Sequence, residues 1–151
     1  MVKINVIAVG KVKEEYFRAA IEEYKKRLNK FAFVNLIEIK EENTDDFHRD
    51  LKTEAESILP KIKGESFALC VEGKEIDSVR FSKIIKSAVD AGEELTFVIG
   101  SSFGLDDSVK NAVKNRVSMS KMTFPHTMAR VVLFEQLYRA FMIMTGGTYH
   151  K

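Results

Sequence analysis

The chain has 151 residues, 45% of them hydrophobic and 30% charged, which fits one globular domain spanning residues 1–151. Its single cysteine, Cys70, excludes an internal disulfide, argues against a zinc-type metal site and fits a reduced, cytoplasmic setting. The net charge of +2 is unevenly divided, because residues 108–151 carry seven Lys and Arg residues against Glu135 alone. A cationic end on an acidic body is typical of a protein that presents one side to a polyanion, although chance segregation in a short window gives the same balance.

The N-terminal part alternates predicted strands and helices. Val2 to Val9 is rich in β-branched residues and predicts a strand, which is too short and too polar for a signal peptide. An amphipathic helix is expected from Glu14 to about Leu28, and a second strand from Phe33 to Ile39. A further helix follows over about residues 47–58, and Pro60 is expected to end it.

The same alternation continues through the second half of the chain. The expected elements are a strand at 66–71, a turn at 72–74, a helix from Asp77 or Ser78 to Gly92, a strand at 95–99, a short helix from Asp106 or Asp107 to Val113, and a strand at 117–120. This order predicts an α/β fold with a mostly parallel sheet and helices on both faces. Ligands bind such sheets at the carboxyl ends of the strands, where residues 69–73, 100–104 and 119–125 are the candidate loops.

A long apolar helix is predicted from Thr127 to about Met144, between Pro125 and the pair Gly146-Gly147. A helix so apolar all round is buried, either in a large core or between subunits. In a small protein the second option is simpler, so we expect a homodimer through this helix. Its three charges argue against a membrane span.

Two loops could bind a small molecule. Gly100 to Gly104 would let backbone approach a ligand, but its spacing excludes the dinucleotide and P-loop motifs. Met119 to Phe124 is unusually apolar for a connection. It forms either a wall around an apolar group such as an adenine ring or a plug in the core.

The C-terminal tail places Tyr149, His150 and Lys151 in succession after the glycine pair. These residues combine a stacking face, a titratable base and a cation, which suits a nucleotide, although terminal residues are usually frayed. Arg139 forms either an ion pair with Glu135 or, together with Arg130, a contact with phosphates.

Several motifs together resemble the RlmH branch of the SPOUT methyltransferases, over essentially the whole chain. They are IAVGK at 7–11, FVIG at 97–100 followed by Gly104-Leu105, SKMTFPH at 120–126, EQLYRAF at 135–141 and the terminal YHK. The resemblance implies a SPOUT-type α/β knot with a C-terminal trefoil knot, a homodimer and S-adenosylmethionine as cofactor. It also implies methylation of N3 of a pseudouridine in 23S ribosomal RNA (pseudouridine-1915 in the family) on the assembled ribosome.

The resemblance also assigns residues to roles. Arg139, Tyr149 and His150 would face the target base, with His150 as a base or as a group that steers one. The cofactor would be bound by Leu69, Gly100, Met119, Ser120, Lys121, Met122, Thr123 and Phe124.

One position departs from the family pattern, because Ser101 stands where a second glycine is usual. If this position needs a positive φ, a serine costs about 1–3 kcal/mol of strain and weakens cofactor binding. Two alternative functions follow: a non-catalytic ribosome-binding or assembly factor with a degenerate cofactor pocket, and a methyltransferase of the same fold that acts on a different RNA.

Overall fold

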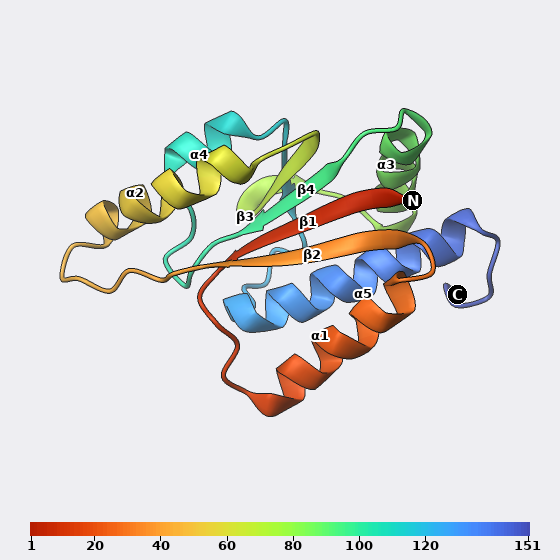
Figure 1. Cartoon of the computed structure of the whole chain (residues 1–151), viewed down its shortest axis with the longest axis horizontal. Helices are drawn as coiled ribbons and strands as arrows, with labels where there is room; N and C mark the ends of the chain where they lie inside the picture. The colour runs from red at the N-terminus through yellow and green to blue at the C-terminus, as the bar shows by residue number, and fades with distance from the viewer.

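A computed structural model describes all 151 residues and contains one five-stranded sheet (Figure 1). All paired strands are parallel, in the order β2-β1-β4-β3-β5. The strands are β1 (Val2–Val9), β2 (Ala32–Ile39), β3 (Glu65–Glu75), β4 (Leu95–Ile99) and β5 (Asn115–Ser118). The helices are α1 (Glu15–Leu28), α2 (Phe47–Ile58), the 3-10 helix η1 (Leu59–Lys61), α3 (Ser78–Asp90), α4 (Asp107–Ala112) and α5 (His126–Met144). The predicted α/β class is confirmed.

The sheet separates two hydrophobic clusters, because successive strand residues point to opposite faces. In β1, Ile4, Val6 and Ala8 are buried in a cluster with residues of α1, α3 and α5. Ile7 and Val9 are buried on the other face, in a cluster with residues of α2 and α4. Helices therefore cover both faces, as the sequence predicts (Figure 1).

Strand β3 differs from expectation, because the turn expected at 72–74 is a bulge inside the strand. Both Leu69 and Lys74 pair with Val117 of β5, so residues 70–73 leave the ladder between them. Gly73 lies in this bulge, and a Cβ there would come within 2.6 Å of the Val117 backbone. Strand β5 begins and ends two residues earlier than expected, since the chain turns away after Ser118.

Helix α5 packs against α1 and α3. One side of it is buried through residues such as Leu133 and Leu137, while Met128 on another side remains 38% exposed. The predicted end of this helix before Gly146-Gly147 is confirmed, since α5 ends at Met144 and Gly146 follows it with a φ of 73°. None of the helices combines the length and hydropathy that crossing a membrane requires. The strand order shows which strands are neighbours, but it does not show whether the chain passes through a loop of itself. The trefoil knot therefore stays a prediction.

Candidate functional site

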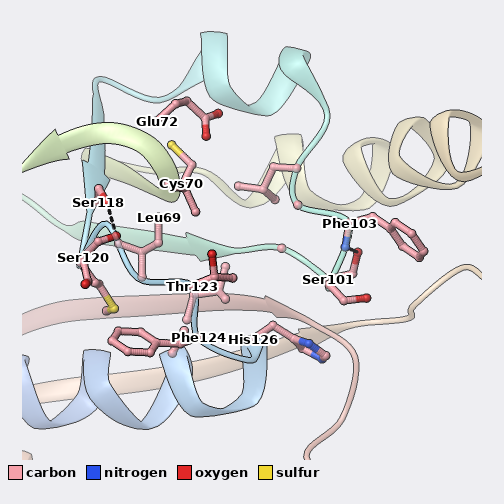
Figure 2. A pocket seen from close by; sticks show the side chains of 18 of the residues that line it. Leu69, Cys70, Glu72, Ser101, Phe103, Ser118, Ser120, Thr123, Phe124 and His126 are labelled. Atoms are coloured by element: carbon pink, nitrogen blue, oxygen red, sulfur yellow. Dashed lines mark hydrogen bonds between the residues drawn. The ribbon is translucent and has the colours of Figure 1, made fainter.

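A cavity of about 340 Å³ lies between the bulge of β3 and the carboxyl end of β4, beside the first turns of α5 (Figure 2). Three segments line it: residues 69–72, the loop 100–105 after β4, and residues 118–124 after β5. His126 and Ala129 add the start of α5. These are the loops that parallel-strand geometry predicts to meet at one sheet edge.

Most of the predicted cofactor residues line this cavity. They are Leu69, Gly100, Met119, Ser120, Met122, Thr123 and Phe124. Lys121 does not line the cavity, and its side chain is exposed to solvent. The cavity also includes Lys110 of α4, between the second and third of these segments, which the sequence pattern did not single out as a site residue.

The loop after β4 is held in a tight turn. A Cβ on Gly100 would lie 2.2 Å from the carbonyl oxygen of Gly104, so only glycine permits this close approach. The Phe103 N–H donates to Ser101 Oγ over 3.3 Å, and the Gly104 N–H donates to the Ser101 carbonyl over 2.9 Å (Figure 2). No residue other than glycine has a positive φ. The strain at Ser101, which would have been the sign of a degenerate pocket, is therefore absent.

The segment 118–124 is shaped by its own serines. Ser118 Oγ donates to the Ser120 carbonyl over 3.0 Å, and Ser120 Oγ accepts from the Met122 N–H over 3.0 Å. Met122 is 76% exposed, while Phe124 is half-buried and lines both this cavity and a neighbouring one of about 310 Å³. Met122 and Phe124 therefore form cavity walls, whereas Met119 both lines the cavity and packs against the core.

The charged groups at the cavity are paired. Lys110 Nζ lies 2.5 Å from Glu72 Oε1, and this hydrogen bond lowers the pKa of the Glu72 carboxyl. Burial, reinforced by the Glu72 charge, raises the pKa of the Cys70 thiol. Cys70 is therefore a neutral thiol at neutral pH and not an activated nucleophile. No group of three or more His, Cys, Asp or Glu side chains could hold a metal ion.

The structure also brings the three predicted target-side residues together, at the other end of α5. Arg139 Nε donates to Glu135 Oε1 over 2.6 Å, and its Nη1 lies 3.1 Å from His150 Nδ1. The Arg139 guanidinium carbon lies 4.8 Å from the centre of the Tyr149 ring. Burial and a hydrogen bond with Tyr24 raise the pKa of Tyr149 to about 12. We call Arg139, Tyr149 and His150 the tail cluster.

Helix α1 extends the tail cluster in a way that sequence reasoning missed. Arg27 lies over the rings of Tyr24 and Tyr138, at 5.3 and 5.5 Å. Tyr138 in turn meets Tyr149 edge to face, with ring centres 4.9 Å apart. The amphipathic pattern of α1 indicated only that Tyr24 faces the core. Nothing in the sequence around Arg27 indicated that its guanidinium would lie over aromatic rings.

The cavity and the tail cluster are far apart within one chain. Arg139 follows His126 by thirteen residues, which is about 20 Å along a helix that rises about 1.5 Å per residue. Figure 1 shows the C-terminus at the end of α5 opposite its first turn. A single copy therefore holds both halves of the predicted site without joining them.

Arg130 corrects one sequence-based expectation. Its side chain is 1% exposed, and it donates to Glu38 Oε2 over 2.7 Å and to the Gly10 carbonyl over 3.2 Å. A guanidinium enclosed in this way cannot contact RNA phosphates. Its partners lie about a hundred residues away in the sequence, so no local pattern indicated this role.

Comparisons with known proteins agree with this architecture. A family model described as "Predicted SPOUT methyltransferase" matches residues 2–150. Proteins named "Ribosomal RNA large subunit methyltransferase H" are 43% identical in Caldicellulosiruptor saccharolyticus and 45% identical in Clostridium botulinum (strain Kyoto), in each case over 98% of this chain and 99% of the relative. The protein of that name from Streptococcus suis is 42% identical over 99% of both chains.

A solved structure supports the fold alone. It is that of a probable methylase family protein from Haemophilus influenzae Rd KW20, with a TM-score of 0.52 and 10% identity over 95% of this chain. This chain spans 66% of the length of that protein. The family match over nearly every residue, together with relatives at 42–45% identity, shows that the chain belongs to the SPOUT methyltransferase family.

Proposed function

We propose that this protein transfers a methyl group from S-adenosylmethionine to N3 of a pseudouridine in 23S ribosomal RNA. We further propose that it acts on the assembled ribosome in the cytoplasm. The observation that supports this most directly is a cavity at the carboxyl edge of the sheet in a chain whose relatives are named for the large ribosomal subunit. The exposed cations within 108–151, such as Lys114, Lys121 and Lys151, suit an RNA partner.

The lining of the cavity fits S-adenosylmethionine. Ten of its twenty lining residues are hydrophobic, which suits an adenine ring, and Gly100 keeps backbone groups accessible beside them. Leu69, Met119 and Phe124 would flank the ring, while Lys121 would lie outside the pocket. The bound cofactor supplies a methyl group made electrophilic by its sulfonium. The protein then mainly has to align donor and acceptor.

The tail cluster would receive the target base. Tyr149 would border the ring as a neutral phenol, because its pKa of about 12 keeps it protonated at neutral pH. Arg139 would place a positive charge beside the ring, and the exposed Lys151 would contact phosphate. His150 completes the cluster through its contact with Arg139.

A homodimer through α5 would join the two halves of the site. Outside the buried side of α5, Met128 is exposed and Val131, Val132 and Met142 are only partly covered. Pairing two copies through this surface would bury apolar area. In a two-fold pair with helices running in opposite directions, the tail cluster of one copy would lie beside the cavity of the other. The separation of about 20 Å within one copy supports this arrangement.

The test is transfer of a labelled methyl group from S-adenosylmethionine to intact ribosomes, with the modified base mapped. We expect incorporation into one pseudouridine of the large subunit, and little into free ribosomal RNA or transfer RNA. Preferred methylation of transfer RNA would instead support a different RNA substrate. Absence of cofactor binding by calorimetry would support a non-catalytic ribosome-binding factor.

A further inference from the structure

The contact between Arg139 and His150 restricts what the imidazole can do. Arg139 Nη1 lies 3.1 Å from His150 Nδ1. A guanidinium has five N–H donors, no acceptor and no accessible deprotonated form. The Nδ1 atom must therefore accept this hydrogen bond, which uses its lone pair. The imidazole is then neutral and carries its proton on Nε2.

We infer that His150 acts on the target ring as a hydrogen-bond donor through Nε2–H, and not as the base that removes the N3 proton. This inference rests on the proposed function, because it assumes a pseudouridine ring beside the tail cluster. The sequence had led us to expect His150 as a base or as a group that steers one. A protonated Nδ1 would instead face the Arg139 donor and place two N–H groups against each other. In the imidazolium it would also place two positive charges side by side.

The neighbouring groups offer no other base. Both Glu135 oxygens lie near Arg139 Nε, at 2.6 and 3.3 Å, so this carboxylate is committed to the guanidinium. Tyr149 is a protonated phenol at neutral pH. The remaining cations and phenols around the cluster are Tyr24, Arg27, Tyr138 and Lys151. The one further carboxylate side chain, Glu23, accepts from Arg27 Nε over 2.7 Å, and this hydrogen bond lowers its pKa, so it too is committed to a guanidinium.

The proton of N3–H therefore leaves to water. The negative charge that remains on the ring is shared by the two carbonyl oxygens that flank N3. A fixed Nε2–H donor and the Arg139 cation stabilise this charge where it develops. The N3 electron pair would then form a bond to the methyl carbon of the bound cofactor while the carbon–sulfur bond breaks. The electrons of that bond would return to sulfur, leaving S-adenosylhomocysteine with a neutral thioether.

The first test is the tautomer, which needs no enzymatic activity. The chain has three histidines, so ¹⁵N-histidine spectra of the free protein at neutral pH can be assigned with the His150→Gln variant. We expect His150 as the neutral Nε2–H form, and a mixed tautomer in Arg139→Met. An Nδ1–H form or an imidazolium in the wild-type protein overturns the inference.

The second test compares His150→Gln with His150→Ala in single-turnover methylation of ribosomes. Glutamine keeps an N–H donor near the place of Nε2 but cannot act as a base at neutral pH. We expect His150→Gln to retain activity within about tenfold of wild type, and His150→Ala to lose about 100-fold or more. Equal, large losses in both variants would indicate a base and overturn the inference.

The pH dependence separates the same two roles. With water as the acceptor, the wild-type rate rises about tenfold per pH unit across the neutral range, without a plateau. A plateau in the wild-type profile that His150→Gln abolishes indicates His150 as the base and contradicts the inference. If wild-type protein fails to methylate ribosomes at all, the proposed function fails, while the tautomer measurement still decides the state of His150.

Discussion

At the scale of single residues, Gly100 sets the shape of the loop after β4, which we propose binds the cofactor. Replacing it by Ala puts a Cβ 2.2 Å from the Gly104 carbonyl oxygen, so the loop after β4 must move. We expect Gly100→Ala to weaken S-adenosylmethionine binding at least about tenfold, which is 1.4 kcal/mol, as measured by calorimetry. Gly92→Ala is the control, since its φ of 70° makes alanine costly by about 1 kcal/mol far from the cavity. Equal cofactor affinity in both variants would show that the loop after β4 is not part of the binding site.

Tyr149 makes a prediction about alkaline pH. Its pKa is raised to about 12 by burial and by Tyr24, whereas an unfolded tyrosine titrates near about 10. The folded state therefore keeps a proton that the unfolded chain loses, and this contribution to stability is complete below pH about 10 and lost as the pH approaches about 12. The chain has four tyrosines and no tryptophan, which simplifies tyrosinate absorbance. The difference titration between wild type and Tyr149→Phe should have a midpoint near 12, and a midpoint near 10 would show that Tyr149 is freely solvated.

At the scale of elements, Arg130 ties the start of α5 to the carboxyl ends of two strands. It bonds Glu38 of β2 and the Gly10 carbonyl that follows β1. Arg130→Met should lower the free energy of unfolding in urea by about 3 kcal/mol, because it leaves a carboxylate and a buried carbonyl without their partner. Arg18→Met removes an exposed pair with Glu15 and should cost less than about 1 kcal/mol. If the two variants lose similar amounts of the free energy of unfolding, the buried contacts of Arg130 stabilise the fold no more than an exposed ion pair does.

Local patterns were sufficient for most of these elements. Val2–Val9 and Leu95–Ile99 coincide with their predicted ranges. Alternation of apolar residues and enrichment in β-branched residues are properties of the strand's own sequence, so they can be recognised without knowledge of the fold. The bulge in β3 was not predictable in this way. Gly73 is a bulge residue only because it meets Val117, which lies far along the chain, and a glycine after an apolar run otherwise indicates a turn.

The features of the candidate site can likewise be separated into those that the sequence predicts and those that it does not. The three loops around Gly100 were predictable because strands of a parallel sheet end at one edge. The burial of Arg130 and the tautomer of His150 were not, because each depends on a contact that folding creates. The contact between Arg139 and His150 spans only eleven residues, yet it requires the chain to reverse after Gly146, whose φ is 73°.

At the scale of the whole molecule, the proposed site requires either a second copy or a large rearrangement. The cavity and the tail cluster lie at opposite ends of α5, about 20 Å apart. Two inactive variants can separate these possibilities. One lacks residues 149–151 and keeps its cavity. The other carries Ala129→Trp, which fills the cavity from the half-buried wall of α5 and keeps the tail.

When the two variants are unfolded together and refolded at equal amounts, about half of the dimers are mixed. Each mixed dimer has one intact cavity, on the copy without a tail, and one intact tail, on the other copy. If the tail acts across the interface, one site of the two is complete, so methylation of ribosomes should recover to about a quarter of the wild-type rate. If each tail served its own cavity, no combination would contain a complete site, and the mixture would stay as inactive as its components. Mixing wild type with the double variant at equal amounts is the complementary control. If the tail acts across the interface, only wild-type homodimers are active and about a quarter of the wild-type rate remains, whereas about half remains if each tail serves its own cavity.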